Sequence, residues 1–414
     1  MQYSKLFGKT IKDAPKDEVA INAKLLLRGG FIDKLMTGSY TLLHLGRRVE
    51  QKIEQIIREE MNATGAGEIL MPLLHPKEIW NETGRWDSAR EVMYQFKKDD
   101  KEYALSFTHE EIVMDLIRKH VASYKDFPVK IYHFSTKFRD EKRAKSGILR
   151  GREFLMKDLY SAHVSEGDMM KYYDEIKKVY IKIFKRMGLD ALLTQAGGGV
   201  FTKNFTHEFQ VIADSGEDEI IYCPKGDFCT NVEVKTEEEK CKLCQATLKK
   251  TKAIEVGNIF PLGTYYSEKM GVNFTDKDGK RQPVWLASYG IGLTRAVGAI
   301  VEVHHDEKGI VWPKEVAPYD VHLVHIEDPT TEKFAKEVND TLEKNGIEVL
   351  WDDRETVSVG AKFADADLIG IPVRLVVSKR NGDKIELKER KSDPSTSSGQ
   401  VELLSLDEVI KRLS

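Results

Sequence analysis

The sequence has 414 residues, of which 41% are hydrophobic and 32% charged, and its formal net charge is −3. This length suits two or three domains with ordinary hydrophobic cores. The apolar runs are far too short to cross a bilayer and the N-terminus lacks a cleavable signal pattern, so we expect a cytoplasmic protein with no membrane contact. With so small a net charge the whole molecule has no field that attracts nucleic acid, and an RNA partner would have to be bound by local basic patches.

The N-terminal part predicts a short helix, a long helix and a short strand. Residues 20–28 have a helical pattern that is stopped by two glycines. Residues 40–60 form an amphipathic helical pattern, with an apolar stripe that includes Val49 and Ile53. A strand pattern at 67–72 follows and ends in proline. Taken alone, the stripe indicates packing against a core.

The next prediction is a strand that leads into a helix. Residues 101–107 are strand-like, and Thr108 stands where a helix would begin. A threonine at the N-cap followed three residues later by a glutamate, here Glu111, is the pattern of a capping box. The capping box is the purely structural explanation of this stretch.

A charged hairpin is predicted at residues 136–162. Arg139 and Glu141 end the first strand, and a loop rich in lysine and arginine follows. One face of the return strand carries Arg152, Phe154, Met156 and Asp158. Arginine forks match phosphate oxygens and keep their charge, so the hairpin could hold a triphosphate. A hairpin whose charges simply face solvent explains this stretch alone equally well.

A glycine triplet at 197–199 precedes a strand pattern at 202–210. The triplet indicates a loop that another group approaches closely. By pattern alone, His207 and Glu208 are ordinary polar residues of the strand.

All four cysteines lie in one short, highly charged insert at residues 222–252. One pair has the C-x2-C spacing of metal sites, and a cytoplasmic protein has no need of disulfides. A small tetrahedral zinc site with four thiolates is therefore predicted, and free thiols on a surface insert are the alternative. The ligands of this predicted site are Cys223, Cys229, Cys241 and Cys244.

A strand-to-helix turn with two glycines follows. An apolar run ends at Gly290 and Gly292, and Arg295 lies on the first turn of the helical pattern after it. Glycines let a backbone approach a ligand closely, and an arginine at a helix start lies where an anion would bind. The spacing alone is a weak signal.

The C-terminal residues predict a separate α/β module. After a charged linker at 304–318, strand patterns at 321–326, 348–351 and 373–377 alternate with two helical patterns. The alternation predicts a parallel or mixed sheet, which by pattern alone could belong to any small α/β module. Residues 392–400 are predicted to be a flexible surface loop.

Several separated motifs together resemble one family. Phe138, Arg139 and Glu141 resemble motif 2 of the class II aminoacyl-tRNA synthetases, the turn that leads to Arg295 resembles motif 3, and the long helix with its strand resembles motif 1. Further motifs are similar to those of the bacterial-type prolyl-tRNA synthetases, and they lie at 108–111, 152–158, 206–210, 257–264, 287–292 and 351–372. The resemblance covers nearly the whole chain.

The resemblance implies two domains and a dimer. Residues 1–303 would form an α+β class II catalytic domain, an antiparallel sheet flanked by helices, with the cysteine-rich insert at 222–252. After the linker, residues 319–414 would form an α/β anticodon-binding domain for tRNA(Pro). Motif 1 would form a homodimer interface.

The resemblance also implies the chemistry, which is ATP-dependent activation of L-proline and transfer to tRNA(Pro), with Mg²⁺ on the phosphates. The expected catalytic residues are Arg139 at the α-phosphate and the proline carboxylate, Glu141 on the adenine side, and Arg295 at the γ-phosphate. The expected ATP-binding set is Arg139, Glu141, Arg150, Arg152, Phe154, Gln210, Gly292 and Arg295. The expected proline-binding set is Thr108, Glu110, Arg139, Met156, Asp158, His207, Ser288 and Gly290. The expected anticodon-binding set is Asp353, Arg354 and Lys362.

The chain departs from the family pattern in places, and two other functions stay open. Phe107 stands where the family usually has proline, and the span from Phe209 to Gly257 has no room for the editing domain that most relatives insert there. Another class II synthetase, such as a threonine-type enzyme, would share the fold. A non-catalytic tRNA-binding paralog would share it too, although the intact Arg139, Glu141 and Arg295 favour an active enzyme.

Overall fold

The computed structural model of the chain describes residues 1–142, 144, 146–197, 206–234, 239–326, 328–390 and 401–413. The chain forms two compact units, one made of residues 1–35, 40–53 and 300–414 and the other of residues 36–39 and 54–299. The first unit thus contains both N-terminal and C-terminal residues. The domain boundary predicted from the sequence, between residues 303 and 304, stays a prediction. The predicted loop at 392–400, the start of the strand at 202–210 and most of the glycine triplet lie outside the described residues.

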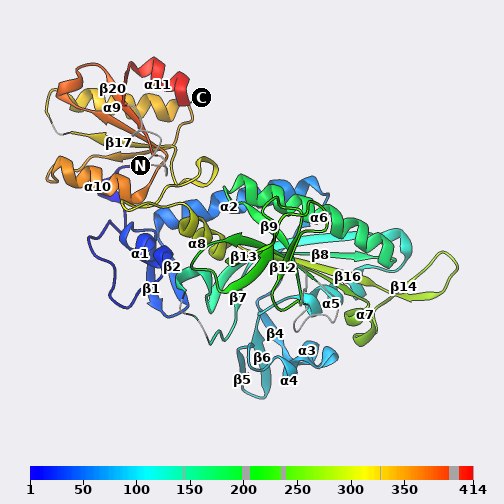
Figure 1. Cartoon of the computed structure of the whole chain (residues 1–414). Coiled ribbons are helices and arrows are strands. Elements are labelled where there is room, and N and C mark those ends of the chain that lie inside the picture. The colour runs from blue at the N-terminus through cyan, green and yellow to red at the C-terminus, as the bar shows by residue number, and fades with distance from the viewer. Residues whose placement is uncertain are drawn as a thin grey trace. The chain divides into compact units, whose positions relative to one another are not determined.

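A mixed sheet forms the centre of the second unit (Figure 1). Among the described residues its strands are β3 (Gly67–Glu68), β7 (Val129–Phe138), β8 (Glu153–His163), β9 (Ala191–Ala196), β10 (Thr206–Ile212), β11 (Asp218–Tyr222), β12 (Cys229–Asn231), β13 (Lys249–Gly263) and β16 (Trp285–Gly292). Their order is β10-β9-β12-β11-β13-β16-β8-β7-β3, and the run from β13 to β7 is antiparallel. The predicted α+β arrangement is present, and two parallel pairings, β12 with β9 and β3 with β7, make the sheet mixed instead of purely antiparallel.

The predicted hairpin is formed by β7 and β8. The two strands pair antiparallel along their whole length, from Val129 opposite Ala162 to Phe138 opposite Glu153. Side chains alternate between the two faces of a strand, so the even-numbered residues of β8 share one face and the odd-numbered residues the other. This alternation decides which residues of β8 reach the site described below.

Helices pack on both faces of this sheet. On the odd-numbered face of β8, helix α6 (Glu166–Arg186) buries an aromatic stripe that includes Tyr173, Tyr180 and Phe184. On the other face lies a second core, to which Trp80, Phe107 and Tyr160 contribute. That core is built from β8 and β16 together with α3 (Lys77–Thr83), α4 (Arg85–Ser88), α5 (Glu110–His120) and α7 (Tyr265–Lys269), and from the small sheet of β4 (Leu74–Pro76), β6 (Lys101–Leu105) and β5 (Gln95–Lys98).

The predicted N-terminal helices are present, and the long one begins later than expected. Their elements are α1 (Ile21–Arg28), β1 (Ile32–Met36), β2 (Ser39–Leu42) and α2 (His44–Ala63). Residues 39–42 pair with β1 instead of extending the helix. The side chain of Asn22 in α1 donates to Glu302 at 2.6 Å in the core of the first unit. Glu302 belongs to α8 (Leu293–Val303), the helix that follows β16.

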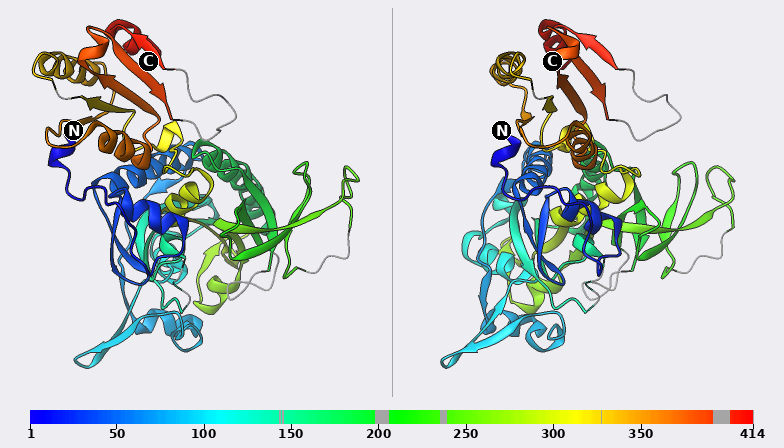
Figure 2. Two further views of the ribbon diagram at one scale, coloured as in Figure 1. Left: turned by 60° about the vertical axis from the view of Figure 1, so that its left-hand side comes forward. Right: turned by 90° about the vertical axis from the view of Figure 1, so that its left-hand side faces the viewer.

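The C-terminal residues form the predicted α/β module (Figures 1 and 2). Its described elements are β17 (Val321–His325), α9 (Glu332–Lys344), β18 (Val349–Asp352), α10 (Val359–Ile369), β19 (Val373–Val377), β20 (Ile385–Glu389), β21 (Glu402–Leu404) and α11 (Leu406–Leu413). Strands β18, β17 and β19 are parallel, while β20 and β21 are antiparallel additions at one edge. Helices α9 and α11 pack on one face and α10 on the other. The sheet is therefore mixed, and its last two strands and last helix had not been predicted.

The remaining described elements are short. They are β14 (Asn273–Thr275) with β15 (Arg281–Pro283), and the 3-10 turns at Tyr3–Lys5, Tyr124–Asp126, Gly147–Leu149, Lys314–Val316 and Lys379–Asn381. No helix in the described part of the chain is long and apolar enough to cross a membrane.

The end of α10 provides a test of packing in the C-terminal module. Gly370 has φ +78°, and a Cβ atom there would lie 2.0 Å from the carbonyl oxygen of Ile310. Gly346 has φ +77° with open space around it. We expect Gly370→Ala to lower the free energy of unfolding by about 3 kcal/mol or more, because backbone must move, and Gly346→Ala by about 1–2 kcal/mol for the left-handed conformation alone. Denaturant unfolding of the full chain, followed by tryptophan fluorescence, measures both, and equal losses would contradict the close contact.

Candidate active site

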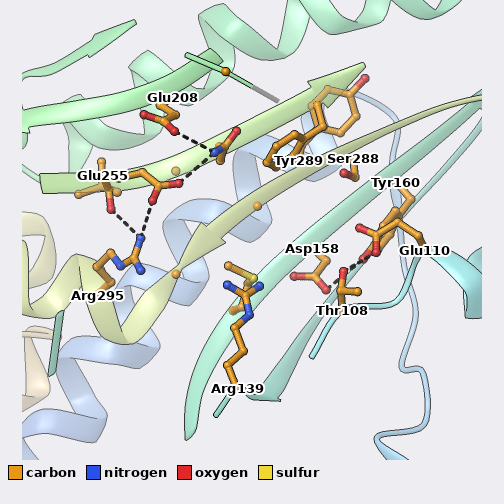
Figure 3. Close-up of a pocket in the computed structure, with 18 of the residues that line it drawn as sticks. Thr108, Glu110, Arg139, Asp158, Tyr160, Glu208, Glu255, Ser288, Tyr289 and Arg295 are labelled. Atoms are coloured by element: carbon orange, nitrogen blue, oxygen red, sulfur yellow. Dashed lines mark hydrogen bonds and ion pairs between the residues drawn. The ribbon is translucent and has the colours of Figure 1, made fainter. Parts of the chain in front are cut away.

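A pocket of about 390 Å³ opens on the even-numbered face of β8 (Figure 3). This volume is within the range of small-molecule sites. Strands β8, β13 and β16 and the residues just before α5 supply most of its walls. The lining residues are Thr108, Glu110, Arg139, Met156, Asp158, Tyr160, Gly197, Glu208, Glu233, Glu255, Val256, Gly257, Asn258, Phe260, Ser288, Tyr289, Gly290, Gly292 and Arg295.

Arg139 directs its guanidinium into this pocket (Figure 3). Its Nε donates to the carbonyl oxygen of Phe107 at 3.3 Å, and its guanidinium carbon lies 5.2 Å from the centre of the Phe154 ring. Within the described residues, no carboxylate forms an ion pair with it. Burial, together with the nearby charge of Arg295, lowers the pKa of Arg139. An anionic ligand would therefore supply the counter-charge that this guanidinium lacks.

The pocket is also lined by a carboxylate that two donors hold in place. Thr108 Oγ1 donates to Glu110 Oε2 at 2.5 Å, and Arg85 Nη1 donates to the same oxygen at 3.2 Å. Arg85 is buried, packs over the ring of Phe107 at 4.8 Å, and also donates to Tyr266 at 2.9 Å. Because a buried charge needs partners, Arg85 and Glu110 fix each other in place.

The predicted capping box is wrong. Helix α5 begins at Glu110 with His109 as its N-cap residue, and no side-chain capping bond is present among the described residues. Glu111 points into the core, where it accepts from Thr83 at 2.7 Å and pairs with Arg85 at 3.1 Å. Burial raises the pKa of Glu111 to about 7. The two glutamates thus share one arginine behind the pocket wall.

Asp158 lies at the base of the pocket in a buried polar network. Its Oδ2 lies 2.6 Å from Lys137 Nζ, 3.3 Å from His133 Nε2 and 3.3 Å from the hydroxyl of Tyr160. Burial alone would raise the pKa of Asp158, but the charge of Lys137 and hydrogen bonds from His109 and His133 hold it well below its usual value. Its other oxygen, Oδ1, is buried and finds no hydrogen-bond partner in the described chain. An ionised carboxylate with one open lone pair therefore faces the pocket.

His109, His133 and Asp158 are close enough together to bind a metal ion. The ammonium of Lys137 already lies among them, 3.1 Å from His109 Nδ1 and 3.4 Å from His133 Nε2. A lysine cation thus takes the place where a metal ion would be bound.

A second acidic wall is formed by Glu208 and Glu255. Asn258 Nδ2 bridges them, at 3.4 Å from Glu208 and 3.1 Å from Glu255, and Arg295 pairs with Glu255 at 3.0 Å. Burial and the charge of Glu255 raise the pKa of Glu208 to about 8. The Oδ1 of Asn258 is buried and unpartnered among the described atoms. Carboxylate and amide oxygens suit a hard divalent cation such as Mg²⁺, whose charge would relieve this repulsion.

Comparison with known proteins identifies the family of the chain. Residues 94–304 match the class II tRNA synthetase core domain of the glycine, histidine, proline, serine and threonine enzymes, and residues 320–414 match an anticodon-binding domain. The proline–tRNA ligase of Wolbachia from Brugia malayi is 40% identical over an alignment of 428 positions, which covers 99% of this chain and 99% of that protein. The proline–tRNA ligase of Sulfurihydrogenibium is 34% identical over 565 residues, which cover all of this chain and 99% of that protein.

The chain belongs to the prolyl-tRNA synthetase family. Solved structures agree in fold: the prolyl-tRNA synthetase of Cryptosporidium parvum in complex with halofuginone and AMPPNP has a TM-score of 0.78 at 19% identity, covering 95% of this chain and 75% of that one. The Giardia lamblia enzyme in complex with prolyl-adenylate has a TM-score of 0.77 at 20% identity, covering 93% and 74%. The alignment with the Sulfurihydrogenibium relative is much longer than this chain, so the additional length of that protein has no counterpart here.

Most of the expected proline set lies in the pocket, but His207 does not. The set's lining members are Thr108, Glu110, Arg139, Met156, Asp158, Ser288 and Gly290. His207 is 3.0 Å from the hydroxyl of Tyr173 on α6, so it faces the other side of the sheet, and the expectation that it lines the pocket is wrong. Its neighbour Glu208 lines the pocket instead, because adjacent residues of a strand point to opposite faces.

The expected ATP set is divided between the pocket and its edge. Arg139, Gly292 and Arg295 line the pocket. Glu141 pairs with Arg150 at 2.7 Å, and Arg150 lines a smaller cavity of about 140 Å³ that shares Glu255 and Arg295 with the main pocket. Arg152 instead donates to the backbone at Glu141 and Thr37, while Gln210 is buried against Glu208 and Asp218.

Sequence reasoning missed several groups around the pocket. Lys137 and Arg85 touch the wall residues from behind. Lys137 belongs to the charged hairpin predicted at 136–162, and its strand parity, which is that of Arg139, is the signal that indicates a role at the pocket. Glu255 lines the pocket from β13 just before the motif at 257–264, and Asn258 lies within that motif.

The expected anticodon residues are held by contacts within the first unit. Arg354 pairs with Asp352 at 2.7 Å and Asp365 at 2.8 Å, and Asp353 accepts from the side chain of Ser4 at 2.6 Å. Lys362 is only 2% exposed and donates to the carbonyl oxygen of His325 at 2.8 Å. Direct contact between Lys362 and a base conflicts with this burial.

The structure brings three of the four cysteines together. Cys223, Cys241 and Cys244 form a group with Asp227, whereas Cys229 lies in β12 outside it. The four-thiolate ligand set predicted from the sequence is not the set that the structure assembles.

The glutamate pair behind the pocket predicts a pH-dependent stability effect. The pKa of the Glu111 carboxyl rises from 4.5 in the unfolded chain to about 7 in the folded one. The folded protein therefore loses stability as the pH rises through that interval. A glutamine cannot ionise, so Glu111→Gln should gain about 2 kcal/mol relative to the parent protein between pH 5.5 and pH 8. Denaturant unfolding at the two pH values measures this difference. The exposed Glu175→Gln on α6 is the control, and an equal pH dependence in both variants would contradict the buried titration.

Proposed function

We propose that this protein activates L-proline with ATP to give prolyl-adenylate and then transfers the prolyl group to tRNA(Pro). The observation that carries the proposal is the polarity of one pocket. Arg139 supplies a cation without a carboxylate partner among the described residues, and the acids Glu110 and Asp158 line the same pocket. Family membership independently supports the same activity.

This polarity suits an amino acid with its ammonium at one end and its carboxylate at the other. The two N–H groups of a prolyl ammonium need acceptors once they leave water, and Thr108, Glu110 and the open oxygen of Asp158 offer them. The proline carboxylate and the α-phosphate would both meet Arg139. Met156, Phe260 and Tyr160 present apolar surface on which the ring can pack. A threonine-type function would need a polar or metal-bearing group for the hydroxyl, and the nearest such cluster is occupied by Lys137.

ATP would bind beside the amino acid, along the charged residues at the edge of the sheet. Arg139 and Arg295 face the phosphates in this arrangement, and Glu141, Arg150 and Phe154 lie toward the nucleoside. Mg²⁺ held near Glu208 and Glu255 would neutralise phosphate charge as pyrophosphate leaves. A structural zinc ion in the cysteine insert is the second metal that we propose.

The reaction requires no protein nucleophile. A carboxylate oxygen of proline attacks the α-phosphorus, the bond from that phosphorus to the β-phosphate oxygen breaks, and pyrophosphate leaves. A terminal ribose hydroxyl of the tRNA then attacks the carbonyl carbon and releases AMP. The chain's contribution is to align the two substrates and to stabilise developing charge.

We also propose a cytoplasmic homodimer that associates through α2 and β3. Strand β3 is an edge of the large sheet, and Leu70 just after it is 81% exposed. An open edge beside an exposed apolar side chain suits a symmetric interface.

The function is tested by pyrophosphate exchange into ATP with a panel of amino acids. Exchange that depends on proline supports the proposal. Exchange with threonine would identify the threonine-type alternative, and no exchange with any amino acid would identify a non-catalytic paralog.

Arg139→Ala should lower the rate of proline-dependent exchange by about 10²–10³-fold, because a charged group aimed at the transition state is lost. Circular dichroism should show an unchanged fold. Arg118→Ala removes an arginine from the exposed face of α5, where it pairs with Glu82 at 2.8 Å, and should keep near-normal exchange. Similar rates in the two variants would mean that another residue binds the α-phosphate.

The missing insert predicts a lack of editing. Alanine is smaller than proline, and a pocket discriminates against a missing methylene by only about 10–200-fold, so alanine should be activated at a measurable rate. We expect the purified protein to leave preformed alanyl-tRNA(Pro) intact, at the spontaneous rate of hydrolysis. Faster hydrolysis would reveal an editing site on this chain.

A further inference from the structure

Two turns in the cysteine insert close with the same kind of backbone hydrogen bond. In the first, the N–H of Cys223 donates to the carbonyl of Phe228 at 2.7 Å, and in the second the N–H of Cys241 donates to that of Ala246 at 2.9 Å. Each turn also contains a residue of positive φ, Gly226 at +82° and Gln245 at +61°. Both turns therefore begin with a cysteine and close five residues later.

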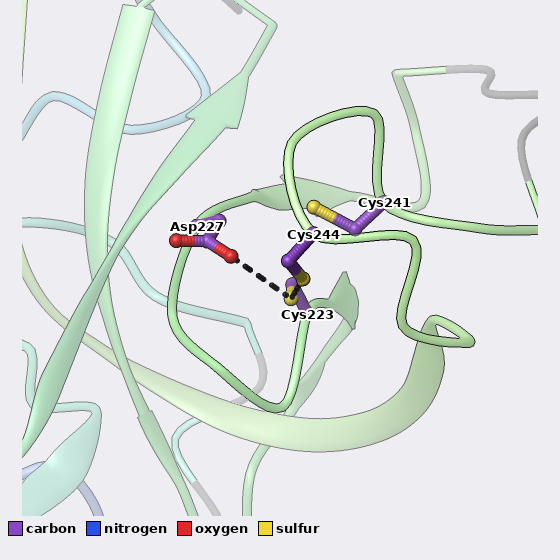
Figure 4. Close-up of side chains that lie close together, drawn as sticks. All are labelled: Cys223, Asp227, Cys241 and Cys244. Atoms are coloured by element: carbon purple, nitrogen blue, oxygen red, sulfur yellow. Dashed lines mark hydrogen bonds between the residues drawn. The ribbon is translucent and has the colours of Figure 1, made fainter.

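The two turns bring their polar side chains to one point (Figure 4). One ligand atom from each of Cys223, Asp227, Cys241 and Cys244 lies within 4.8 Å of all the others. The Sγ atoms of Cys223 and Cys244 are 3.3 Å apart, and Asp227 Oδ2 is 3.8 Å from Cys223 Sγ. Tetrahedral zinc with ligands at about 2.3 Å separates them by roughly 3.8 Å, so these distances fit a four-coordinate ion.

Comparison of the two turns explains why the fourth candidate ligand is an aspartate and not a cysteine. Cys244 is the fourth residue of its turn, and the corresponding residue of the first turn is Gly226, which has no side chain. Asp227, the next residue, directs its carboxylate toward the sulfur atoms (Figure 4). An aspartate oxygen is an accepted zinc ligand.

The backbone at the site favours thiolates. The N–H of Lys225 donates to Cys223 Sγ at 3.4 Å. Donors turned toward sulfur stabilise the charged form that binds metal.

Cys229, unlike the other three cysteines, lies in a small apolar cluster. It is buried in β12, where its sulfur lies 3.0 Å from Thr194 Oγ1. It packs with Ile220 and Ala253 in a small apolar cluster. Cys229 is therefore a core thiol.

We propose that Cys223, Asp227, Cys241 and Cys244 bind one structural Zn²⁺ ion and that Cys229 is not a ligand. The ion ties the turn between β11 and β12 to the segment that leads into β13. Few buried apolar side chains are available there, since the described cluster comprises Ile220, Cys229 and Ala253 with two partly buried neighbours. Metal coordination replaces the missing core, as it does in other small, charged modules. The proposal does not depend on which amino acid the enzyme activates.

The proposed zinc site is connected to the edge of the active-site pocket through β12. Strand β12 lies between β11 and β9, and Glu233 just beyond it accepts from the backbone N–H of Gly197 at 3.1 Å. Both residues line the pocket. Fixing β11 and β12 therefore helps to fix one rim of the active site.

Zinc content of the full-length protein, measured by mass spectrometry after purification in zinc-containing buffer and desalting, tests the ligand set. We expect about one zinc per chain in the parent protein and in Cys229→Ser, and loss of zinc in Cys223→Ser and Cys244→Ser. Asp227→Ala should bind Zn²⁺ at least 10–100-fold more weakly, the loss typical of a partner even one shell further out. Glu239→Ala, an acid of the same insert that is outside the cluster, should bind as the parent does.

Cobalt substitution gives a second, spectroscopic readout of the ligand set. The sulfur-to-Co²⁺ charge-transfer absorption should be the same in the parent protein and in Cys229→Ser, because both supply three thiolates. Loss of zinc in Cys229→Ser together with full binding by Asp227→Ala would overturn the ligand set. A parent protein without zinc, whether its thiols are titratable or Cys223 and Cys244 are joined as a disulfide, would overturn the site itself.

Discussion

The ion pair between Lys137 and Asp158 constrains the sheet on which the pocket is built. Both side chains are buried, and neither could be left without its partner except at a cost of about 3–5 kcal/mol. Their contact at 2.6 Å requires β7 and β8 to pair with His133 opposite Asp158. A slip of one residue would turn Asp158 toward α6 and remove Met156 from the pocket. The pairing of two charges in the interior thus fixes which side chains the substrate meets.

The same register places neighbouring residues of β8 in different surroundings. Lys157, next to Asp158, points to the opposite face, where it contacts the hydroxyl of Tyr180 and the carbonyl of Tyr289. Burial lowers its pKa well below the usual value. Asp158, by contrast, keeps its charge because Lys137 and two histidines face it. One strand therefore presents charge to the pocket and keeps its other side suited to an aromatic core.

Helices and strands could be predicted from the sequence more reliably than the contacts of individual side chains. The hairpin of β7 and β8 and the alternating module from β17 to β19 follow periodic patterns, and these locate an element to within a few residues. Glu111, His207 and Cys229 were assigned wrongly because each assignment depended on a neighbour far away in the chain. Arg85 for Glu111 and Tyr173 for His207 lie 26 and 34 positions away. For β10, the alternation of side chains along a strand places His207 and Glu208 on opposite faces, but it does not show which of the two faces the pocket.

In the first unit, the N-terminal residues contact the residues that had been expected to read the anticodon. Tyr3 lies under the guanidinium of Arg354 at 3.9 Å, and Ser4 donates from its backbone and its hydroxyl to Asp353. Arg354 is also paired with two aspartates, so most of its charge is already compensated and little is left to attract a phosphate. A base that reached Arg354 would have to stack beside Tyr3 or displace it. Tyr3 is fully buried beneath Arg354, so the N-terminal segment helps to hold Arg354 and Asp353 in place, and a base could reach that face of the guanidinium only if Tyr3 moved.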